Sequence, residues 1–317
     1  GREARASGVQ VLLGPAVNIK RSPLCGRNFE YYSEDPYLAG ELAAGFIQGV
    51  QSEGVGTSIK HFAANNQETR RLSADSRVDE RTLHEIYLPA FETAVKKAQP
   101  WTVMCSYNRV NGDYASENKP LLTDILRDDW GFGGFVISDW GAVNDRVKGV
   151  AAGLDLEMPG SGGVYDRKII EAVQNGTLDI GVLDKTVARI LNIVLRAADL
   201  AKLPAVFDHA ADHKLAVELA KQSAVLLRNL GALPLHKGQK VAYIGAFADH
   251  PRYQGGGSSH VNTTAISAMD AAIMNDRSVS YIEGFPADRD QRDEAEFLRA
   301  VTAAEAADVA HDLGAVG

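Results

Sequence analysis

The sequence predicts an α/β fold, a (β/α) TIM-like barrel followed by the start of an α/β sandwich domain. Up to about residue 195, short apolar runs alternate with longer amphipathic ones. No hairpin turn is expected within this alternation, which favours parallel strands joined by crossover helices. The rhythm stops at a proline-containing segment without periodicity, and new strand and helix patterns follow. We therefore expect a barrel domain over 1–197 whose N-terminal part is missing, a linker over 198–210, and a partial sandwich domain over 211–317.

The first unit contains five strand patterns with helix patterns between them. Each strand pattern is a short apolar run, whereas the helix patterns repeat apolar residues at i, i+3 and i+4. The predicted strands are 9–14, 57–62, 102–108, 135–140 and 154–159. The predicted helices are 36–51, 80–98, 121–130, 143–152, 165–175 and 184–202. Residues 1–8 resemble the middle of a helix, so we expect the natural protein to begin upstream.

The second unit begins with a helix pattern and then alternates strands and helices. The predicted elements are a helix that begins at 213 and runs into a short apolar stretch ending at 229, a strand over 240–248, a loop over 253–262, helices over 264–275 and 288–308, and strands over 279–284 and from 307 onward. In the last strand, His311 and Asp312 stand where apolar residues would be expected. So few strands make a poor independent core, so we expect the chain to be truncated or altered at this end.

Composition narrows the class of protein. A chain of 317 residues suits a large barrel plus part of a second unit. The net charge is −8 with both signs interspersed, which argues against nucleic acid as a partner. No apolar run approaches the roughly eighteen residues of a membrane span. Cys25 and Cys105 are too few for a disulfide framework or a zinc site, and as thiols they favour a cytoplasmic location; an upstream export signal stays open.

Polar residues follow the strand patterns at the positions where barrel enzymes carry their sites. Lys60 and His61 end the second strand pattern, Tyr107 follows the third, and Asp139 and Trp140 follow the fourth. Taken singly, each has a structural alternative. Asp139 could cap the next helix, Lys60 could be a solvated lysine, and His61 a hydrogen-bonded core histidine. Their convergence at one rim favours a functional site.

This combination predicts a sugar site. Trp140 offers an apolar platform for a pyranose ring, and Lys60, His61 and an arginine can donate hydrogen bonds to ring hydroxyls. A carboxylate beside that platform can attack an anomeric carbon, because nearby negative charge stabilises an oxocarbenium-like transition state. Asp139 would be this nucleophile. Arg27 receives a site role, whereas Ser33–Asp35 is expected to cap the helix beginning at Pro36.

Five separated motifs follow one another along the chain: GPAVNIKRSPLCGRNFEYYSEDP, IKHFAANNQETRR, MCSYNRVNG, GFVISDW and AGLDLEMPG. Together they resemble glycoside hydrolase family three, in its β-glucosidase branch, and the resemblance continues through SAVLLRNLGALPL and the GGGSS loop. It implies a retaining mechanism with Asp139 as nucleophile, no metal and no cofactor. It also implies that the subsite for the terminal glucose is lined by Arg27, Lys60, His61, Arg71, Tyr107, Trp140 and, on the glycine-rich loop, Ser258.

Two details of this resemblance concern the loop after His61. Arg71 matches better than Arg70, because the family places its arginine at the end of this loop. The β-N-acetylglucosaminidase branch instead carries an Asp–His pair there. No histidine stands between His61 and His84, so that loop cannot supply such an acid.

A second carboxyl group is missing from this pattern. A retaining hydrolase needs an acid about 5–5.5 Å from its nucleophile. Glu30, Glu68 and Glu157 qualify only by residue type: arginines beside Glu68 would lower its pKa, and Glu157 is expected to make structural hydrogen bonds. The resemblance implies that the acid/base lies on a loop beyond this chain, and that an aspartate binding sugar hydroxyls lies upstream. We expect the printed chain to cleave poorly and the full-length protein to hydrolyse β-glucosides.

Several alternatives stay open. Within the family, a β-xylosidase or a mixed-specificity glycosidase fits the same motifs. The fragment alone could be a non-catalytic sugar-binding protein. A different class of enzyme would use Lys60 to form a Schiff base, although nothing reads as a phosphate site for such substrates. The expected partner is a β-glucoside or oligosaccharide, and a homo-oligomer or a complementing chain stays open.

Overall fold

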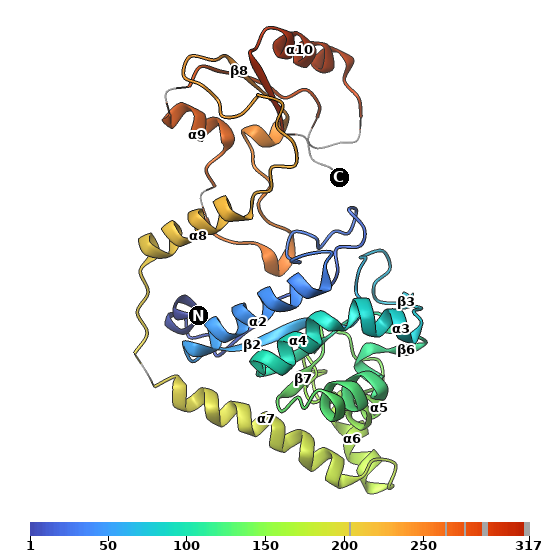
Figure 1. Ribbon diagram of the computed structural model, residues 1–317. Coiled ribbons are helices and arrows are strands. Elements are labelled where there is room, and N and C mark those ends of the chain that lie inside the picture. The colour runs from blue at the N-terminus through green and yellow to red at the C-terminus, as the bar shows by residue number, and fades with distance from the viewer. Residues whose placement is uncertain (203, 264, 276, 287–290, 314–317) are drawn as a thin grey trace. The chain divides into compact units, whose positions relative to one another are not determined.

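The computed structural model describes residues 1–202, 204–263, 265–275, 277–286 and 291–313 (Figure 1). The chain divides into two compact units, Gly1–His213 and Lys214–Gly317. Each unit contains a parallel sheet. Parts of three predicted elements lie outside the described residues: position 264 of helix 264–275, positions 288–290 of helix 288–308, and positions 314–317 of the last strand.

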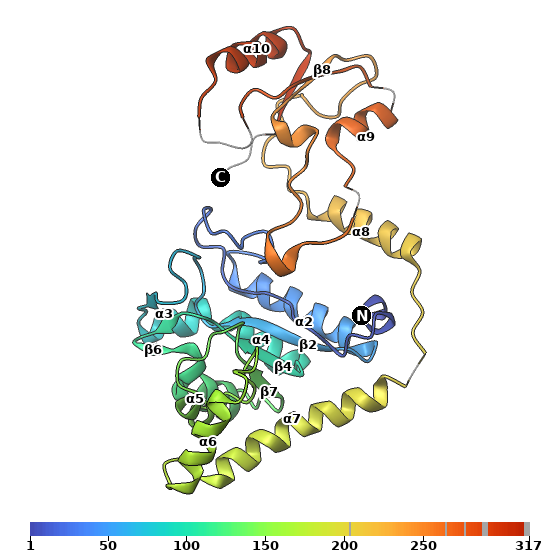
Figure 2. The ribbon, with the colours of Figure 1, turned by 180° about the vertical axis from the view of Figure 1, so that it is seen from behind.

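The first unit is built on a four-stranded parallel sheet. Its strands are β1 (Val11–Leu12), β2 (Gly56–Phe62), β4 (Thr102–Cys105) and β7 (Phe135–Ile137), in that order. Neighbours in the sheet therefore follow one another along the chain, as in a (β/α) barrel. Helices α2 and α4 lie on one side of this sheet and α7 on the other (Figure 2). The parallel β/α arrangement and four of the five predicted strands are confirmed.

The fifth predicted strand, 154–159, is reduced to one isolated parallel bridge between Ile137 and Leu156. The carboxylate of Asp155 explains the difference. Its Oδ2 accepts the backbone N–H of Val136 at 2.7 Å, so a side chain takes a donor that a strand ladder would use. A regular strand is thus replaced by a side-chain-anchored segment.

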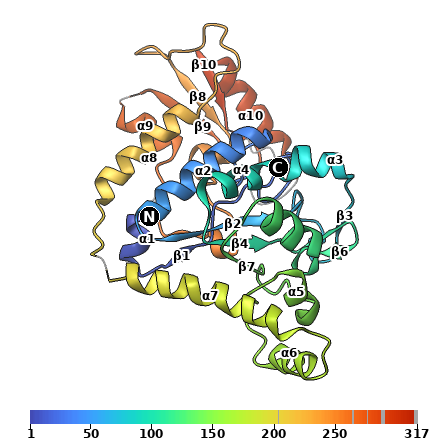
Figure 3. The same cartoon turned by 60° about the horizontal axis from the view of Figure 1, so that its bottom comes forward.

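Helices α2 (Pro36–Ser52) and α4 (Pro89–Ala98) pack side by side (Figures 1 and 3). Asp35 caps α2 by accepting the N–H of Tyr37 at 2.8 Å, which confirms the predicted cap. Gly40 lets the two helices approach closely, because a Cβ there would lie 2.9 Å from Cβ of Thr93. The small residues of α2 therefore serve helix packing.

The predicted helix 80–98 is interrupted. It consists of α3 (Glu80–Thr82), a π-helical turn η1 (Leu83–Tyr87) and α4. Pro89 has no N–H and its ring clashes with a preceding carbonyl, so a regular α-helix cannot continue through it. The N–H of Leu88 instead bonds the carbonyl of Leu83 at 3.0 Å, an i to i+5 hydrogen bond.

The predicted helix 121–130 is also of π type, as η3 (Pro120–Asp129). The N–H of Trp130 bonds the carbonyl of Ile125 at 3.1 Å, again with i to i+5 spacing. The other helices of this unit agree with prediction to within a few residues. They are α1 (Arg2–Ala6), α5 (Arg146–Ala152), α6 (Val164–Gln174) and α7 (Ile180–Leu200).

A small second sheet corrects the expectation that this unit has no hairpin. Strands β5 (Arg109–Val110) and β6 (Asp113–Tyr114) form an antiparallel hairpin, and β3 (Asp75–Ser76) pairs with β5 in parallel. Asn111 and Gly112 have φ angles of 53° and 103°. Two positive φ values in a two-residue loop are typical of a type I′ turn, for which Asn-Gly is the strongest signal. A short 3₁₀ turn, η2 (Ala115–Glu117), follows.

The main core lies between the parallel sheet and helices α2 and α4. Ile59, Phe62, Val103 and Val136 contribute from the strands and are fully buried. Gly134 precedes β7 at the edge of this core, where a Cβ would collide with the carbonyl of Trp101. The core thus fixes where β7 begins and, in turn, where the residues following it are delivered.

The second unit contains a three-stranded parallel sheet in the order β10-β8-β9. The strands are β8 (Val241–Ile244), β9 (Val279–Ile282) and β10 (Val309–Asp312), with helices α9 (Ala268–Met274) and α10 (Glu294–Glu305) and the 3₁₀ turns η4 (Ala246–Ala248) and η5 (Gly257–Ser259). The three predicted strands and the two predicted helices are present here, although β8, α9 and α10 are shorter than predicted. Helix α8 (His209–Ser223) begins four residues before the predicted start at 213, and the apolar stretch predicted to follow it, 224–229, is not helical.

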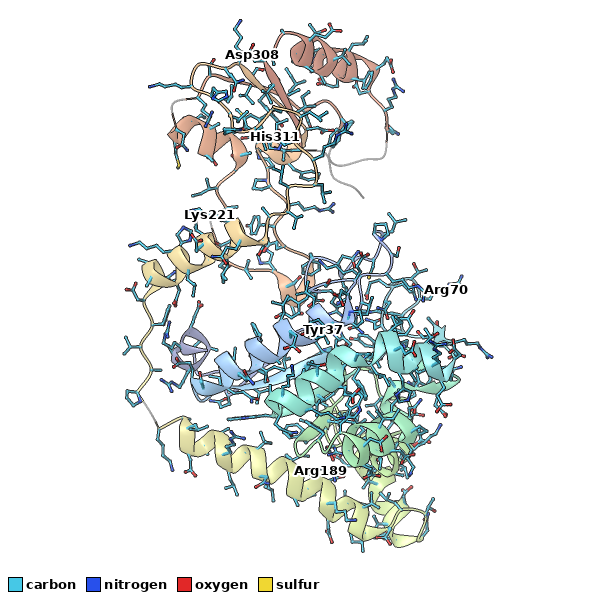
Figure 4. All side chains as sticks on the ribbon, in the orientation of Figure 1. Tyr37, Arg70, Arg189, Lys221, Asp308 and His311 are labelled. Atoms are coloured by element: carbon cyan, nitrogen blue, oxygen red, sulfur yellow. The ribbon has the colours of Figure 1, made fainter. Side chains whose placement is uncertain are left out.

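Strand β10 resolves the question raised by its polar residues. Among the described strands it pairs only with β8, and the side chains of His311 and Asp312 are exposed. Figure 4 labels His311, whose ring centroid lies 5.3 Å from that of Tyr243. A polar pair is therefore compatible with this strand, because its residues do not need to fill a core.

Candidate active site

The first unit brings seven of the eight predicted site residues together at the ends of its strands and on adjacent loops. Lys60 and His61 end β2, Tyr107 follows β4, and Asp139 and Trp140 follow β7. The loops before α2 and after β2 add the other two, Arg27 and Arg71. Since the carboxyl ends of parallel strands meet at one edge of the sheet, this is the convergence that the sequence predicted.

Asp139 is buried, with 8% of its surface exposed. Its Oδ1 accepts the N–H of Trp140 at 2.7 Å. Its Oδ2 accepts no hydrogen bond in the described residues, and Nε2 of His61 lies 3.6 Å from it. Buried carboxylate oxygens are normally satisfied, so this oxygen is held available for another atom.

The alternative role of Asp139 as a helix cap is wrong. Helix α5 begins at Arg146, and its cap is Asp145, whose Oδ1 accepts the N–H of Lys148 at 3.0 Å. Asp139 therefore does not stabilise the helix that follows it. Its position is explained by the site and not by the local chain.

His61 is held rigidly in this site. Its backbone N–H donates to Oδ1 of Asn18 at 2.8 Å, and its carbonyl accepts from Nδ2 of Asn18 at 3.0 Å. Burial, and then the positive charges of Arg27, Lys60 and Arg71, hold the pKa of His61 well below its usual value. The imidazole is therefore neutral, so its contact with Asp139 is not an ion pair, and it can donate one N–H to a ligand.

Arg27 and Lys60 share one carboxylate. Glu30 is ion-paired with Nε of Arg27, and its Oε2 lies 3.8 Å from Nζ of Lys60. Burial lowers the pKa of Lys60, and the charges of Glu30 and Asp139 oppose that shift. For Arg27, burial acts against the charge, but Tyr31 and Glu30 outweigh it and the pKa is raised. Glu30 thus belongs to the site, a role that the sequence analysis did not give it.

Tyr107 and Arg71 contact each other on another side of the site. The Tyr107 hydroxyl donates to the carbonyl of Trp140 at 2.9 Å, and Cζ of Arg71 lies 4.4 Å from the centre of the Tyr107 ring. Burial and the charge of Asp139 raise the pKa of Tyr107 to about 12, so the phenol stays protonated. Glu68 accepts from Nη1 of Arg71 at 2.6 Å. Trp140 is 63% exposed, so its indole can pack against a sugar ring.

Two predictions about this region are not confirmed. Ser258 lies in the second unit on η5 and is exposed, so the structure of the first unit says nothing about it. Glu157 was expected to make structural hydrogen bonds, but its carboxylate makes none in the described residues, and burial raises its pKa. That structural role belongs to Asp155, which pairs with Arg127 and with Arg189 of α7 (Figure 4).

The residues that hold the site in place were not predicted from the sequence. Asn18 stands among apolar residues in AVNIK, which is a signal for a buried polar group with a specific partner. Glu30 and Glu68 each stand three residues from their arginine, Arg27 and Arg71. Such spacing indicates a local ion pair but does not say that the pair lies in a site.

Among the residues that the structure covers, no three His, Cys, Asp or Glu side chains gather as a metal site would require. In that same part of the chain, no helix combines the length and the apolarity needed to cross a bilayer. Cys25 and Cys105 are buried free thiols, as the sequence predicted.

The fold and the site define a (β/α)-barrel protein with a buried carboxylate among cationic and aromatic side chains at its strand ends. Two family models match the chain: Glycosyl hydrolase family 3 N terminal domain over residues 1–193 and Glycosyl hydrolase family 3 C-terminal domain over residues 224–311. The chain belongs to glycosyl hydrolase family 3. Its TIM-like barrel fold and the family resemblance predicted from the sequence are thereby confirmed.

Individual relatives agree with this assignment. The chain is 54% identical over 315 residues to "Thermostable beta-glucosidase B" of Acetivibrio thermocellus, covering 98% of this chain and 42% of that protein. It is 50% identical over 313 residues to "Exo-alpha-(1->6)-L-arabinopyranosidase" of Bifidobacterium longum, covering 95% and 41%. The chain thus spans about two fifths of the length of these relatives.

Solved structures show the same fold. The GH3 β-glucosidase of Bifidobacterium adolescentis has a TM-score of 0.89 and 47% identity, covering 98% of this chain and 46% of that one. β-Glucosidase 3B of Thermotoga neapolitana, solved in complex with glucose, has a TM-score of 0.86 and 40% identity, covering 99% and 49%.

Proposed function

We propose that the protein to which this chain belongs is a retaining β-glucosidase that removes terminal β-D-glucosyl residues. The observation that carries this proposal is the buried Oδ2 of Asp139, which accepts no hydrogen bond in the described residues. It stands beside a neutral histidine, a protonated phenol and an exposed indole. Relatives named β-glucosidases, including one bound to glucose, support the substrate class.

In this proposal Asp139 attacks the anomeric carbon while the bond to the leaving oxygen breaks. The carboxylate forms a covalent glycosyl–enzyme ester, and water then attacks the same carbon and releases glucose and the free carboxylate. Donors on Arg27, Lys60, His61 and Arg71 bind the sugar hydroxyls, and Trp140 supports the ring. Ser258 is assigned to the same subsite by family resemblance alone.

We propose that the proton for the leaving oxygen comes from a carboxyl outside the described cluster. Glu30 and Glu68 are both paired with arginine side chains, and a paired carboxylate is a poor proton donor. An activated leaving group needs little protonation. The nucleophile can therefore be tested on this chain with a donor that does not depend on the acid.

The test is covalent labelling with 2,4-dinitrophenyl 2-deoxy-2-fluoro-β-D-glucoside. The fluorine slows both steps, but the good leaving group lets the ester form and accumulate. Intact-mass spectrometry should show one added fluoroglucosyl group, and peptide mapping should place it on Asp139. Labelling of another residue would end the nucleophile assignment. Glucose binding by calorimetry without labelling would favour the sugar-binding alternative, and borohydride trapping of Lys60 with a keto sugar would favour Schiff-base chemistry.

A second candidate is a mixed-specificity glycosidase of this family. The relative named an arabinopyranosidase, at 50% identity, favours it. Aryl β-D-xylosides differ from β-D-glucosides only in lacking the hydroxymethyl group, so they test whether that group is required. Aryl α-L-arabinopyranosides lack it too and also have the opposite configuration at C4, so they test tolerance at both positions. Comparable kcat/KM values on all three with the full-length protein would replace the strict β-glucosidase assignment. At least about a tenfold preference for glucose, the size expected for one buried group, would support it.

A further inference from the structure

Glu30 is placed between two cationic side chains of the site. Its Oε1 is ion-paired with Nε of Arg27, and its Oε2 lies 3.8 Å from Nζ of Lys60. All three side chains are largely buried, with 17%, 20% and 16% exposure for Arg27, Glu30 and Lys60. The carboxylate therefore joins a loop before α2 to the end of strand β2.

The pairing leaves the ends of both cations available. Within the described residues, Arg27 uses only Nε in a hydrogen bond, and the Nζ of Lys60 has Glu30 as its one ion-pair partner, at 3.8 Å. The two terminal nitrogens of Arg27 and the three N–H groups of Lys60 can therefore donate to a ligand. A carboxylate that binds the inner part of a guanidinium fixes its direction without using its outer face.

We propose that Glu30 is a positioning residue that fixes Arg27 and Lys60 as paired donors to the sugar hydroxyls. This inference rests on the proposed function. Glu30 itself does not contact the reacting atoms and is not the acid/base. Its negative charge also balances two cations that would otherwise repel each other in a buried place.

The alternative role, general acid/base, makes an opposite prediction. A general acid must present a protonated oxygen to the leaving group, whereas both oxygens of Glu30 face cations. If Glu30 were the acid/base, replacing it with Gln would remove the negative charge that repels azide beside the glycosyl ester, so azide could attack the anomeric carbon. If Glu30 positions the two donors, azide should have no effect.

The experiment compares Glu30→Gln and Glu30→Asp with the matched control Glu85→Gln. Glu85 lies in η1 and forms an exposed ion pair with Arg81 at 2.9 Å, and it has no proposed role in the site. Gln keeps the size of Glu30 and removes its charge, whereas Asp keeps the charge and shortens the reach. Each variant is checked for folding by circular dichroism and thermal unfolding before labelling with the fluoroglucoside.

The first readout separates binding from chemistry in the labelling reaction. We expect Glu30→Gln to raise the donor concentration for half-maximal labelling by about tenfold or more, because contacts to a charged group are typically worth that much. The maximal rate constant should change by less than about threefold, since Asp139 is intact. Glu30→Asp should recover part of the loss, and Glu85→Gln should match the parent. Equal half-maximal concentrations in Glu30→Gln and the parent would overturn the proposal.

The second readout does not depend on the reaction. Carbon-13 lysine labelling, with the Cε signal of Lys60 assigned through Lys60→Arg, measures the pKa of that ammonium group. Removing an adjacent carboxylate should lower it by about one unit or more. An unchanged pKa of Lys60 in Glu30→Gln would contradict the positioning role of Glu30, even if the chain does not react with the fluoroglucoside. Failure of the parent to label ends the proposed function alone, and a glycosyl azide formed by Glu30→Gln would overturn the positioning role.

Discussion

Asp139 and Asp155 are both buried aspartates of the first unit, yet their carboxylates are used in opposite ways. Asp155 is 1% exposed and fully bonded: Oδ1 accepts from Nε and Nη2 of Arg189 at 2.9 and 2.6 Å, and Oδ2 from Arg127 and the N–H of Val136 at 2.6 and 2.7 Å. Asp139 is 8% exposed and uses one oxygen on the neighbouring N–H of Trp140.

The difference teaches how the same residue type serves structure or chemistry. A buried charge is costly unless it is paired and hydrogen-bonded, and Asp155 satisfies that requirement with four donors. Asp139 leaves one oxygen unsatisfied, so it gives up stability at a place where a substrate atom can arrive. Saturation of hydrogen bonds, rather than burial, separates the two.

The largest expected effect is on Asp139. Asp139→Asn should reduce the fluoroglucoside labelling rate by about 10⁴-fold, about 5.5 kcal/mol, because an amide cannot form the glycosyl ester. Its unfolding free energy should change by less than about 1 kcal/mol, since only one hydrogen bond, to the Trp140 N–H, depends on the oxygen retained in Asn. Labelling kinetics and urea unfolding measure the two quantities. Persistent labelling at the parent rate would remove Asp139 from the mechanism.

The reverse pattern is expected for Asp155. Asp155→Asn should lower the unfolding free energy by about 3–5 kcal/mol, because Arg127 and Arg189 would lose their shared counter-charge in a buried place. Urea unfolding of the parent and variant measures the difference. The labelled fraction of the folded protein should be unchanged. A small loss, below about 1 kcal/mol, would show that Asp155 is not the structural anchor that its four hydrogen bonds indicate.

Burial of His61 should make the free energy of unfolding depend on pH. Its pKa is lowered in the folded state, mainly by burial, so protonation favours the unfolded chain. Above the unfolded pKa of about 6.5, the buried neutral ring makes its full contribution to the free energy of unfolding. As the pH falls toward the folded pKa, that contribution is lost at about 1.4 kcal/mol per pH unit. His61→Gln should remove this one-proton slope from unfolding free energies measured between pH 6.5 and 5. The exposed His84→Gln serves as control. An unchanged slope in His61→Gln would mean that His61 is not buried as a neutral ring.

The sequence predicted the fold through features that are local. Apolar periodicity located α2 and β2, and the cap at Asp35 was correct because capping depends on adjacent residues. The break at Pro89 and the Asn111–Gly112 hairpin had local signals too, and both could have been predicted from them. The loss of the fifth strand had no such signal, because it depends on Asp155 reaching the N–H of another segment.

The site was predictable by residue type and position but not by partner. Strand ends of a parallel barrel converge, so Lys60, Tyr107 and Asp139 could be expected together. The hydrogen bonds of Asn18 to His61 and the bridge from Glu30 to Lys60 join segments distant in the chain. Such contacts depend on loop geometry, which no periodicity encodes. A carboxylate with all its hydrogen bonds made and one with an oxygen left over therefore look alike in a sequence.

The smallest expected effect concerns Asp145, which has the capping role that Asp139 lacks. Asp145→Ala removes the acceptor for the N–H of Lys148 at the start of α5 and should cost about 1 kcal/mol of unfolding free energy. Asp145→Asn, which can still cap, should cost less. Neither change should alter fluoroglucoside labelling by more than about twofold, because neither touches the carboxylate at β7. Urea unfolding and labelling on the same samples test both statements. A labelling defect as large as that of Asp139→Asn would show that the cap and the site are coupled, and that the aspartate at the strand end owes its position to the helix after all.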